Sequence, residues 1–401
     1  MNEKSIQIYG FRWIVLLLFM FVNITVQILW VSYATVTSVA VAYYNVEEIA
    51  IFLLAAIFMI VYIPVTFLAS WIIDKYDFKV GAGIGAMFQG IFGFLRFIAG
   101  PNFMLVLIFQ IGIAFGQPFI MNAITKLSAN WFPESERTSA TGLGMIAMFL
   151  GIALGMFIPP LVVESFDFQT MVLVFGVLSL ISGILFTVFA KNKPPTPPSS
   201  IISSDKVLMV AGMKQLFKNK NFLILFAVFF LGLGIFNMIT IYIESIVLPR
   251  GFDSVFAGIL GGLMLLGGIA GCVVMSTLSD KYKKRKILLI ASVLIATISL
   301  FAISFTYDGT MLLFFAFLFG FGLLSASPVA LEYAVDATSP VPEATSNGML
   351  LMIGQISGII FILGFEGFTT STGDYFPALI LQSFFLLIGL VMVCFLKEVK
   401  K

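Results

Sequence analysis

The strongest constraint on the fold is a series of long apolar runs, each about twenty residues or longer and nearly free of charge. A run of that length allows an α-helix to cross the hydrocarbon of a bilayer, whereas a membrane β-strand needs only about ten alternating residues. We therefore predict an all-α integral membrane protein with twelve transmembrane helices. The predicted helices are Phe11–Ala40, Glu48–Trp71, Val80–Ala99, Phe103–Ala129, Thr138–Val163, Phe168–Ala190, Phe222–Val247, Ser254–Ser279, Lys286–Phe305, Thr310–Asp336, Glu343–Phe368 and Asp374–Leu396.

Composition argues against several other classes of protein. Charged residues make up 10% of the chain, whereas soluble domains carry about 25%. The net charge is close to zero and no basic-aromatic patch occurs, so we expect no nucleic-acid partner. The chain has no histidine, and its two cysteines, Cys272 and Cys394, lie inside apolar runs. Because the chain lacks histidine, the commonest metal ligand and usual general base, and has no cysteine cluster, we expect no catalytic residue, no metal site and no cofactor.

A polar, proline-broken stretch separates the first six runs from the last six. It extends from Lys191 to Lys220 and begins Lys191-Asn192-Lys193-Pro194-Pro195. Such backbone cannot lie in hydrocarbon. We predict an N-terminal six-helix bundle over residues 1–190, a cytoplasmic linker loop over residues 191–220 and a C-terminal six-helix bundle over residues 221–401. The first run is too long for a cleavable signal peptide, so we expect it to be the first helix.

Positive charge lies almost entirely on one side of this predicted topology. The two ends, the central loop and the even-numbered loops hold every lysine and arginine except Arg96 and Arg250. Since positively charged loops stay in the cytoplasm, we predict a multi-pass protein of the cell membrane with both termini cytoplasmic. Arg96 falls near the outer end of its run, where we expect its side chain to reach the membrane interface.

A loop motif occurs at the same place in both halves. The stretch from Ser70 to Tyr76 reads SWIIDKY after the second run, and the stretch from Ser276 to Tyr282 reads STLSDKY after the eighth. Twelve spans, a long central loop and this motif resemble the major facilitator superfamily, in which two six-helix bundles give alternating access to one site. In this motif Ser70 and Asp77 stand where glycine is usual. The residues expected to act in conformational switching are Asp74, Lys75, Arg137, Asp280 and Lys281.

A narrower resemblance extends over most of the chain. The stretches that carry it are Leu29–Tyr33, Gly116–Ile120, Gly151–Gly155, Leu331–Val335 and Gly354–Gly358. Together they resemble the feline leukaemia virus subgroup C receptor-related transporters, a family linked to choline, ethanolamine and haem. The resemblance implies a small organic substrate that is cationic or amphipathic.

Candidate substrate contacts are polar or aromatic residues inside the runs, where a polar group needs a partner or a ligand. Gln27 and Trp30 share the first run, and an indole face suits a cationic group. The resemblance implies ligand contacts for two glutamines and places Asn237 where the family has a tyrosine of an aromatic cage. The expected substrate-binding residues are Trp30, Gln117, Asn237, Gln355, Gln27 and Tyr33.

Several alternatives remain open at this stage. The solute can be choline or ethanolamine, haem, or another organic solute or drug exported by the same fold. Haem is less favoured because the chain has no histidine to bind its iron. A non-transporting membrane sensor or receptor is the second alternative. The expected partners are a small-molecule substrate and the lipid bilayer, and the chain is expected to be a monomer.

Overall fold

A computed structural model describes residues 8–196, 215–282, 284–339, 341, 343–370 and 373–397. The chain forms two compact units, Met1–Asp205 and Lys206–Lys401. Among the described residues, twelve helices are long and apolar enough to cross a membrane, which confirms the predicted number of spans. The finer division into two bundles and a linker at residues 191–220 stays a prediction.

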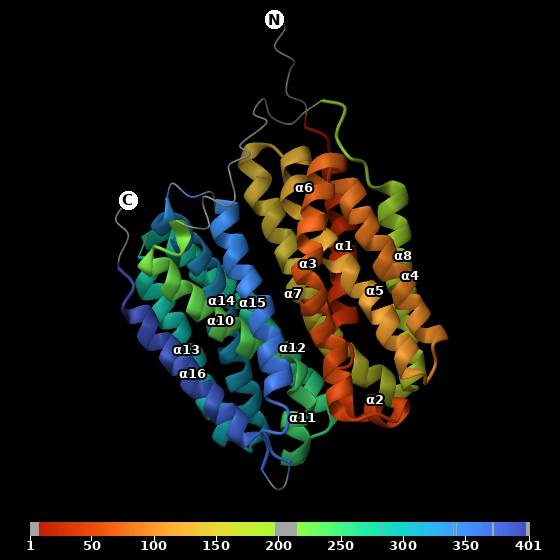
Figure 1. Ribbon diagram of the computed structural model, residues 1–401, viewed down its shortest axis with the longest axis vertical. Helices are drawn as coiled ribbons and strands as arrows, with labels where there is room; N and C mark the ends of the chain where they lie inside the picture. The colour runs from red at the N-terminus through yellow and green to blue at the C-terminus, as the bar shows by residue number, and fades with distance from the viewer. Residues whose placement is uncertain are drawn as a thin grey trace, which may run out of the picture. The chain divides into compact units, whose positions relative to one another are not determined.

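Each unit is a bundle of helices that run alongside one another (Figure 1). Unit 1 contains α1 (Phe11–Val31), α2 (Thr37–Tyr44), α3 (Glu48–Tyr76), α4 (Phe78–Ile98), α5 (Phe103–Met121), α6 (Ile124–Trp131), α7 (Glu134–Ser165) and α8 (Phe168–Phe189). Unit 2 contains α10 (Lys220–Ile241), α11 (Ile243–Val247), the 3₁₀-helix η1 (Leu248–Arg250), α12 (Ser254–Tyr282), α13 (Arg285–Phe305), α14 (Gly309–Thr338), α15 (Glu343–Gly364) and α16 (Phe376–Cys394).

Glycines allow some helices to touch backbone to backbone. A Cβ atom on Gly85 of α4 would lie 2.5 Å from the carbonyl oxygen of Gly116 on α5, and one on Gly116 would lie 2.6 Å from that of Gly85. In unit 2, a Cβ on Gly320 of α14 would collide with the backbone of Met264 on α12. Small residues at helix contacts of this kind are typical of membrane bundles.

Three of the predicted spans are interrupted. The prediction of one helix over Phe11–Ala40 is wrong, because α1 ends at Val31 and α2 begins at Thr37. The fourth span breaks between α5 and α6, four residues after Pro118, and the seventh breaks at Tyr242 between α10 and α11. Interrupted helices occur in transporters where backbone lines a protein-enclosed site. The breaks therefore mark where to look for function.

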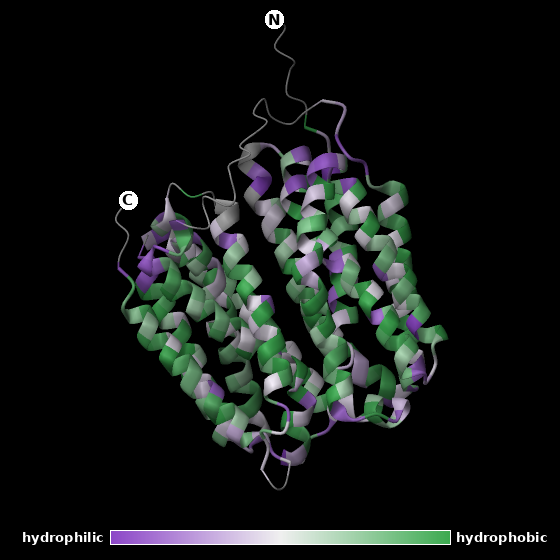
Figure 2. Ribbon diagram, viewed as in Figure 1, coloured by the Kyte–Doolittle hydropathy of each residue, from purple (hydrophilic) through white to green (hydrophobic). Residues whose placement is uncertain are grey.

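Hydropathy changes from the middle of the helices to their ends (Figure 2). Apolar residues cover their middle portions, and hydrophilic residues gather at their ends. Large apolar side chains such as Leu17, Ile108 and Val391 are exposed, as expected of a surface that faces lipid. Buried polar side chains lie inside each unit, among them Gln89, Gln110 and Gln382.

Candidate functional site

Trp30 lies in the last turn of α1, one residue before the first break. Its side chain is 8% exposed, and its indole Nε1 donates a hydrogen bond to the Ala55 carbonyl of α3 at 3.3 Å. Gln27 faces another helix, because a Cβ on Gly151 of α7 would lie 2.9 Å from the Gln27 Cβ. Asn23 also faces α7, where its amide donates to the Gly144 carbonyl at 2.9 Å. The end of α1 thus presents its indole to α3 and its amides to α7.

Tyr33 lies inside the break between α1 and α2, and its ring is enclosed by protein. Phe168 stacks on it with ring centroids 5.6 Å apart, and the Tyr44 ring meets it edge-on at 6.2 Å. The Arg96 guanidinium lies over the same ring, 5.1 Å from its centroid. These three neighbours leave Tyr33 4% exposed, so its ring has no open face for a substrate in this structure.

Gln117 lies on α5 directly after Gly116, where α4 approaches most closely. It is buried, yet its amide makes no hydrogen bond to any residue that the structure describes. Five residues later, at the break after α5, the Asn122 amide donates to the Thr66 hydroxyl at 2.9 Å and the Ser70 hydroxyl at 3.1 Å. These bonds hold the interrupted fourth span against α3.

In unit 2, Asn237 and Gln355 lie on the neighbouring helices α10 and α15. The Asn237 amide donates to the Leu233 carbonyl one turn earlier in α10, at 2.8 Å. A Cβ on Gly354 of α15 would collide with the Leu233 side chain, so the residue before Gln355 packs on the turn that ends at Asn237. Gln355 is partly exposed, and no described residue is hydrogen-bonded to its side chain.

The residues predicted to act in switching lie near helix ends and differ in their contacts. Asp74 is exposed and bonds to no described group, while the Lys75 ammonium lies over the rings of Trp71 and Tyr76 at 4.8 and 5.0 Å. Arg137 donates to the Phe132 carbonyl at 3.3 Å and to the Ala129 carbonyl at 3.5 Å, at the end of α6. Lys281 is exposed, with its ammonium 5.4 Å from the Tyr282 ring centroid, and the side chain of Asp280 lies outside the described residues.

Asp77, three residues after Asp74, contacts a lysine and the start of a helix. Its carboxylate accepts hydrogen bonds from the backbone N–H of Phe78 at 2.9 Å and from the Asn130 amide at 2.6 Å. The Lys193 ammonium lies 3.0 Å from its second oxygen. Asp77 has φ 78° and ψ 169°, a backbone region that glycine alone adopts readily. The missing glycine noted in the sequence was the available signal for this site.

Lys193 belongs to a short segment that lies against unit 1, Lys191–Thr196. The Trp131 indole donates to the Lys191 carbonyl at 3.0 Å, and the Asn130 amide donates to the Asn192 carbonyl at 3.3 Å. The Asn192 side chain accepts from the Lys79 backbone N–H at 3.3 Å. The first residues of the predicted linker are thus fixed to the loop between α3 and α4 and to the end of α6.

Arg96 does not reach the membrane interface, and that prediction is wrong. Its side chain is 1% exposed inside unit 1, and no carboxylate among the described residues lies within ion-pair distance. Arg250 of unit 2 is also buried, but it pairs with Asp374 at 3.6 Å and donates to the Ile303 carbonyl at 2.7 Å. The glycines Gly85 and Gly93, which share a helix face with Arg96, were the sequence signal for its burial.

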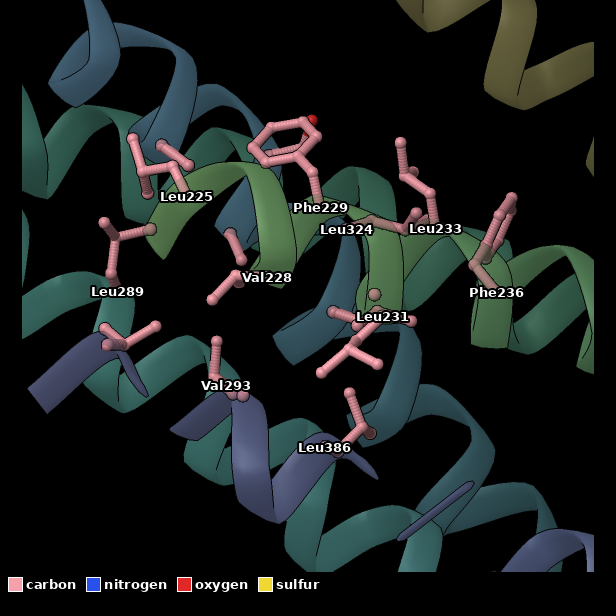
Figure 3. A pocket seen from close by; sticks show the side chains of 17 residues that line it. Leu225, Val228, Phe229, Leu231, Leu233, Phe236, Leu289, Val293, Leu324 and Leu386 are labelled. Carbon is pink, nitrogen blue, oxygen red and sulfur yellow. The ribbon is translucent and has the colours of Figure 1, made fainter. Parts of the chain in front are cut away.

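A small cavity inside unit 2 is lined mainly by apolar side chains. Figure 3 shows apolar side chains of α10, α13 and α16, among them Leu231, Val293 and Leu386, that point toward it. Its volume is about 50 Å³, whereas a cavity that binds benzene measures about 150 Å³. It is therefore too small and too apolar to hold a cationic organic solute.

Comparisons with known proteins agree with this architecture. The model of the Major Facilitator Superfamily matches residues 12–362. The chain is 30% identical to solute carrier family 49 member A3 of Xenopus tropicalis over 92% of this chain and 80% of that protein. It is 26% identical to the choline/ethanolamine transporter flvcr2a of Danio rerio over 99% of this chain and 88% of the relative. These relatives confirm the narrower resemblance that the sequence showed.

Solved structures show the same fold. A bacterial homologue of the human lysosomal transporter Spinster, in an inward-facing and occupied conformation, matches 98% of this chain and 98% of its own with a TM-score of 0.76 at 14% identity. The nucleoside transporter NupG matches 95% of this chain and 99% of its own with a TM-score of 0.72 at 15% identity. The matched family model, the relatives and the twelve spans together show that the chain belongs to the Major Facilitator Superfamily.

Proposed function

We propose that the protein is an alternating-access transporter of the cell membrane that moves a small cationic or amphipathic organic solute such as choline or ethanolamine. The main support for this substrate class is the likeness to the choline/ethanolamine transporter flvcr2a along 99% of the chain. The distribution of positive charge supports an orientation with both termini in the cytoplasm.

The observation that carries the proposed site is a difference among the glutamine amides inside the helices. Gln89 donates to the Val22 carbonyl at 3.1 Å, and Gln110 donates to the Leu54 carbonyl at 3.0 Å, so both serve the fold of unit 1. Gln117 and Gln355 make no such bond in the described part of the chain, and the same is true of the Gln27 Nε2 atom and of the Gln382 amide enclosed in unit 2. A polar group in a membrane bundle is costly without a partner, and a substrate hydroxyl or amine would supply one.

Each proposed residue has a defined role. The indole of Trp30 offers a face to a cationic nitrogen, an attraction of about 0.5–2 kcal/mol. Gln117 and Gln355 bind polar groups of the solute, and Asn237 replaces the second aromatic side chain of the family's cage. Such weak contacts suit a transporter, because a substrate that binds tightly leaves slowly. The buried ring of Tyr33 is assigned to packing.

The proposed switching residues lie at helix ends, where small movements cost little packing. Asp74 and Lys75 are exposed at the end of α3, and Lys281 is exposed at the end of α12. We assign to them, to Asp280 and to Arg137 the exchange of ion pairs and helix-terminus contacts that accompanies alternating access.

Uptake of radiolabelled choline into proteoliposomes tests the proposed site. Gln117→Ala and Gln355→Ala each should reduce uptake about five- to tenfold, because each removes a contact worth about 1–1.5 kcal/mol from a weakly bound solute. Ser357→Ala is the matched control, since this hydroxyl lies two residues from Gln355 and bonds to the Gly354 carbonyl of its own helix. Full uptake by both glutamine variants would remove them from the site.

A ligand screen tests the substrate class separately. Choline, ethanolamine, amino acids and haem are added in turn to the purified protein, and the unfolding temperature is measured. A ligand that binds only the folded state stabilises it and so raises this temperature. At a ligand concentration one hundred times the dissociation constant, the added stability is about 2.7 kcal/mol. Stabilisation by haem alone, or by amino acids alone, would contradict the proposed cationic solute.

A further inference from the structure

Arg96 is a buried cation without an acidic partner in the described part of unit 1. It is 1% exposed, and its Nε and Nη2 atoms are enclosed and unbonded. A charged side chain in a membrane bundle is expensive and usually pairs with a carboxylate or marks a functional position. The way in which unit 1 stabilises this charge therefore indicates what Arg96 does.

The Nη1 atom of Arg96 closes a ring of hydrogen bonds through four helices. It donates to the Leu29 carbonyl of α1 at 3.4 Å and to the Gln110 side-chain oxygen of α5 at 2.9 Å. The Gln110 amide donates to the Leu54 carbonyl of α3 at 3.0 Å. Trp30, next to Leu29, donates to the Ala55 carbonyl, next to Leu54. Two neighbouring residues of α1 are thereby tied to two neighbouring residues of α3, on one side directly and on the other through Arg96 and Gln110.

The same position explains how the charge is tolerated. Leu29 lies two residues before the end of α1, where carbonyl groups lose their helical partners and carry partial negative charge. The ring of Tyr33, in the break itself, adds a cation–π contact at 5.1 Å. Arg96 thus compensates the end of a broken helix, which a carboxylate could not do.

We propose that Arg96 and Gln110 are positioning residues, which fix the indole of Trp30 and the break after α1 in the conformation that receives the substrate. The substrate contact of Trp30 belongs to the proposed function, and this inference rests on it. Arg96 itself touches no solute, since every atom of its guanidinium is enclosed by unit 1 or bonded within it.

The ring predicts a specific pattern of variants. Arg96→Gln removes the bonds to Leu29 and Gln110, and Gln110→Leu removes the bonds to Arg96 and Leu54. Each single variant breaks the same ring of hydrogen bonds. The double variant should therefore lose no more function than the more affected single variant, whereas the losses caused by independent residues would add. Arg96→Lys keeps a donor and a charge on a shorter stem and should restore part of the function.

Fluorine NMR of the full chain labelled with 5-fluorotryptophan reads Trp30 directly. Trp30→Phe identifies its resonance among those of the four tryptophans. Arg96→Gln and Gln110→Leu should both shift and broaden that resonance, with Arg96→Lys in between. The matched control is Arg250→Gln, another buried arginine over a tyrosine ring, which donates to the Ile303 carbonyl near the end of α13 in unit 2. An unmoved Trp30 resonance in both ring variants overturns the proposal.

Transport kinetics add the functional readout. The apparent KM of choline should rise about tenfold in Arg96→Gln and Gln110→Leu, while the maximal rate stays within about twofold, because binding geometry is lost and the switching residues are untouched. A Trp30 resonance that moves while KM and the maximal rate both stay unchanged supports the positioning role and refutes the substrate contact of Trp30. A maximal rate that collapses at unchanged KM overturns the positioning role.

Discussion

Asp77 offers a test in which backbone strain and side-chain contacts predict different outcomes. Its φ of 78° and ψ of 169° fall in a region that costs a residue other than glycine about 1–3 kcal/mol. Its carboxylate repays this cost through three contacts. We therefore compare Asp77→Ala, which keeps the strain and loses the contacts, with Asp77→Gly, which loses both.

The magnitudes follow from the structure. The N-cap bond to Phe78 contributes about 1 kcal/mol and the charged bond to Asn130 about 1.5 kcal/mol. Lys193 is 65% exposed, so its ion pair contributes only about 0.5 kcal/mol. Asp77→Ala should therefore destabilise unit 1 by about 3 kcal/mol. Asp77→Gly regains about 2 kcal/mol of strain and loses about 0.7 kcal/mol to the entropy of the unfolded chain.

Asp77→Gly should accordingly be more stable than Asp77→Ala by about 1.3 kcal/mol. For a unit of this size that difference corresponds to roughly 3–5 °C in the unfolding temperature, measured in detergent by tryptophan fluorescence. Asp74→Ala is the matched control, because that carboxylate is exposed and should change the temperature little. If the glycine variant unfolds at or below the temperature of the alanine variant, the strain argument is wrong.

Two further predictions concern stability alone. Gly232→Ala should stabilise unit 2 by about 1 kcal/mol, because alanine favours helix and the new methyl would meet only Leu323, at 3.7 Å beside the apolar cavity. Gly271→Ala should destabilise unit 2, because its methyl would collide with the Phe321 carbonyl. Equal unfolding temperatures for the two variants would refute the packing argument. The backbone N–H of Thr170 donates to the Asp167 carboxylate at the start of α8 and lowers the pKa of that carboxyl. The stability that this carboxylate gives to unit 1 is complete above the ordinary carboxyl pKa and is lost as the pH falls through the lowered pKa. In Asp167→Asn, which still caps the helix, the unfolding temperature should change less between about pH 5 and 3 than in the unmodified protein.

The number of spans could be predicted from the sequence because it depends on a local quantity. A run of about twenty apolar residues satisfies its own backbone as a helix, whatever surrounds it. The break after Val31 could not be predicted in this way, because the run continues past it without a charge or a proline. Its only local sign is the group of small and hydroxylated residues from Ser32 to Thr37, where the Thr37 hydroxyl donates to the Tyr33 carbonyl at 3.0 Å.

Long-range pairs account for the remaining differences. Asp77 contacts Lys193, which lies 116 positions later in the sequence. The sequence around either residue gives no sign of this contact. Arg96 was expected at the interface because its place in the helix was known while its neighbours were not. Its burial depends on Gln110 of α5 and on Tyr33 in the break between α1 and α2. Sequence position gives depth along a helix, but only packing decides which face is enclosed.

The break in α1 links the stability of unit 1 to its proposed role. Ending a helix inside a bundle leaves carbonyl groups that lipid cannot solvate, so protein donors must reach them. Arg96 and the Ser32 hydroxyl both donate to the Leu29 carbonyl, each at 3.4 Å, and the backbone N–H of Ala34 donates to the Val31 carbonyl at 2.9 Å. A break held by a few long or single bonds can rearrange at low cost, whereas a continuous helix would have to unwind. The residues that donate hydrogen bonds to the free carbonyl groups of this break are therefore the ones expected to set the geometry of Trp30 during transport.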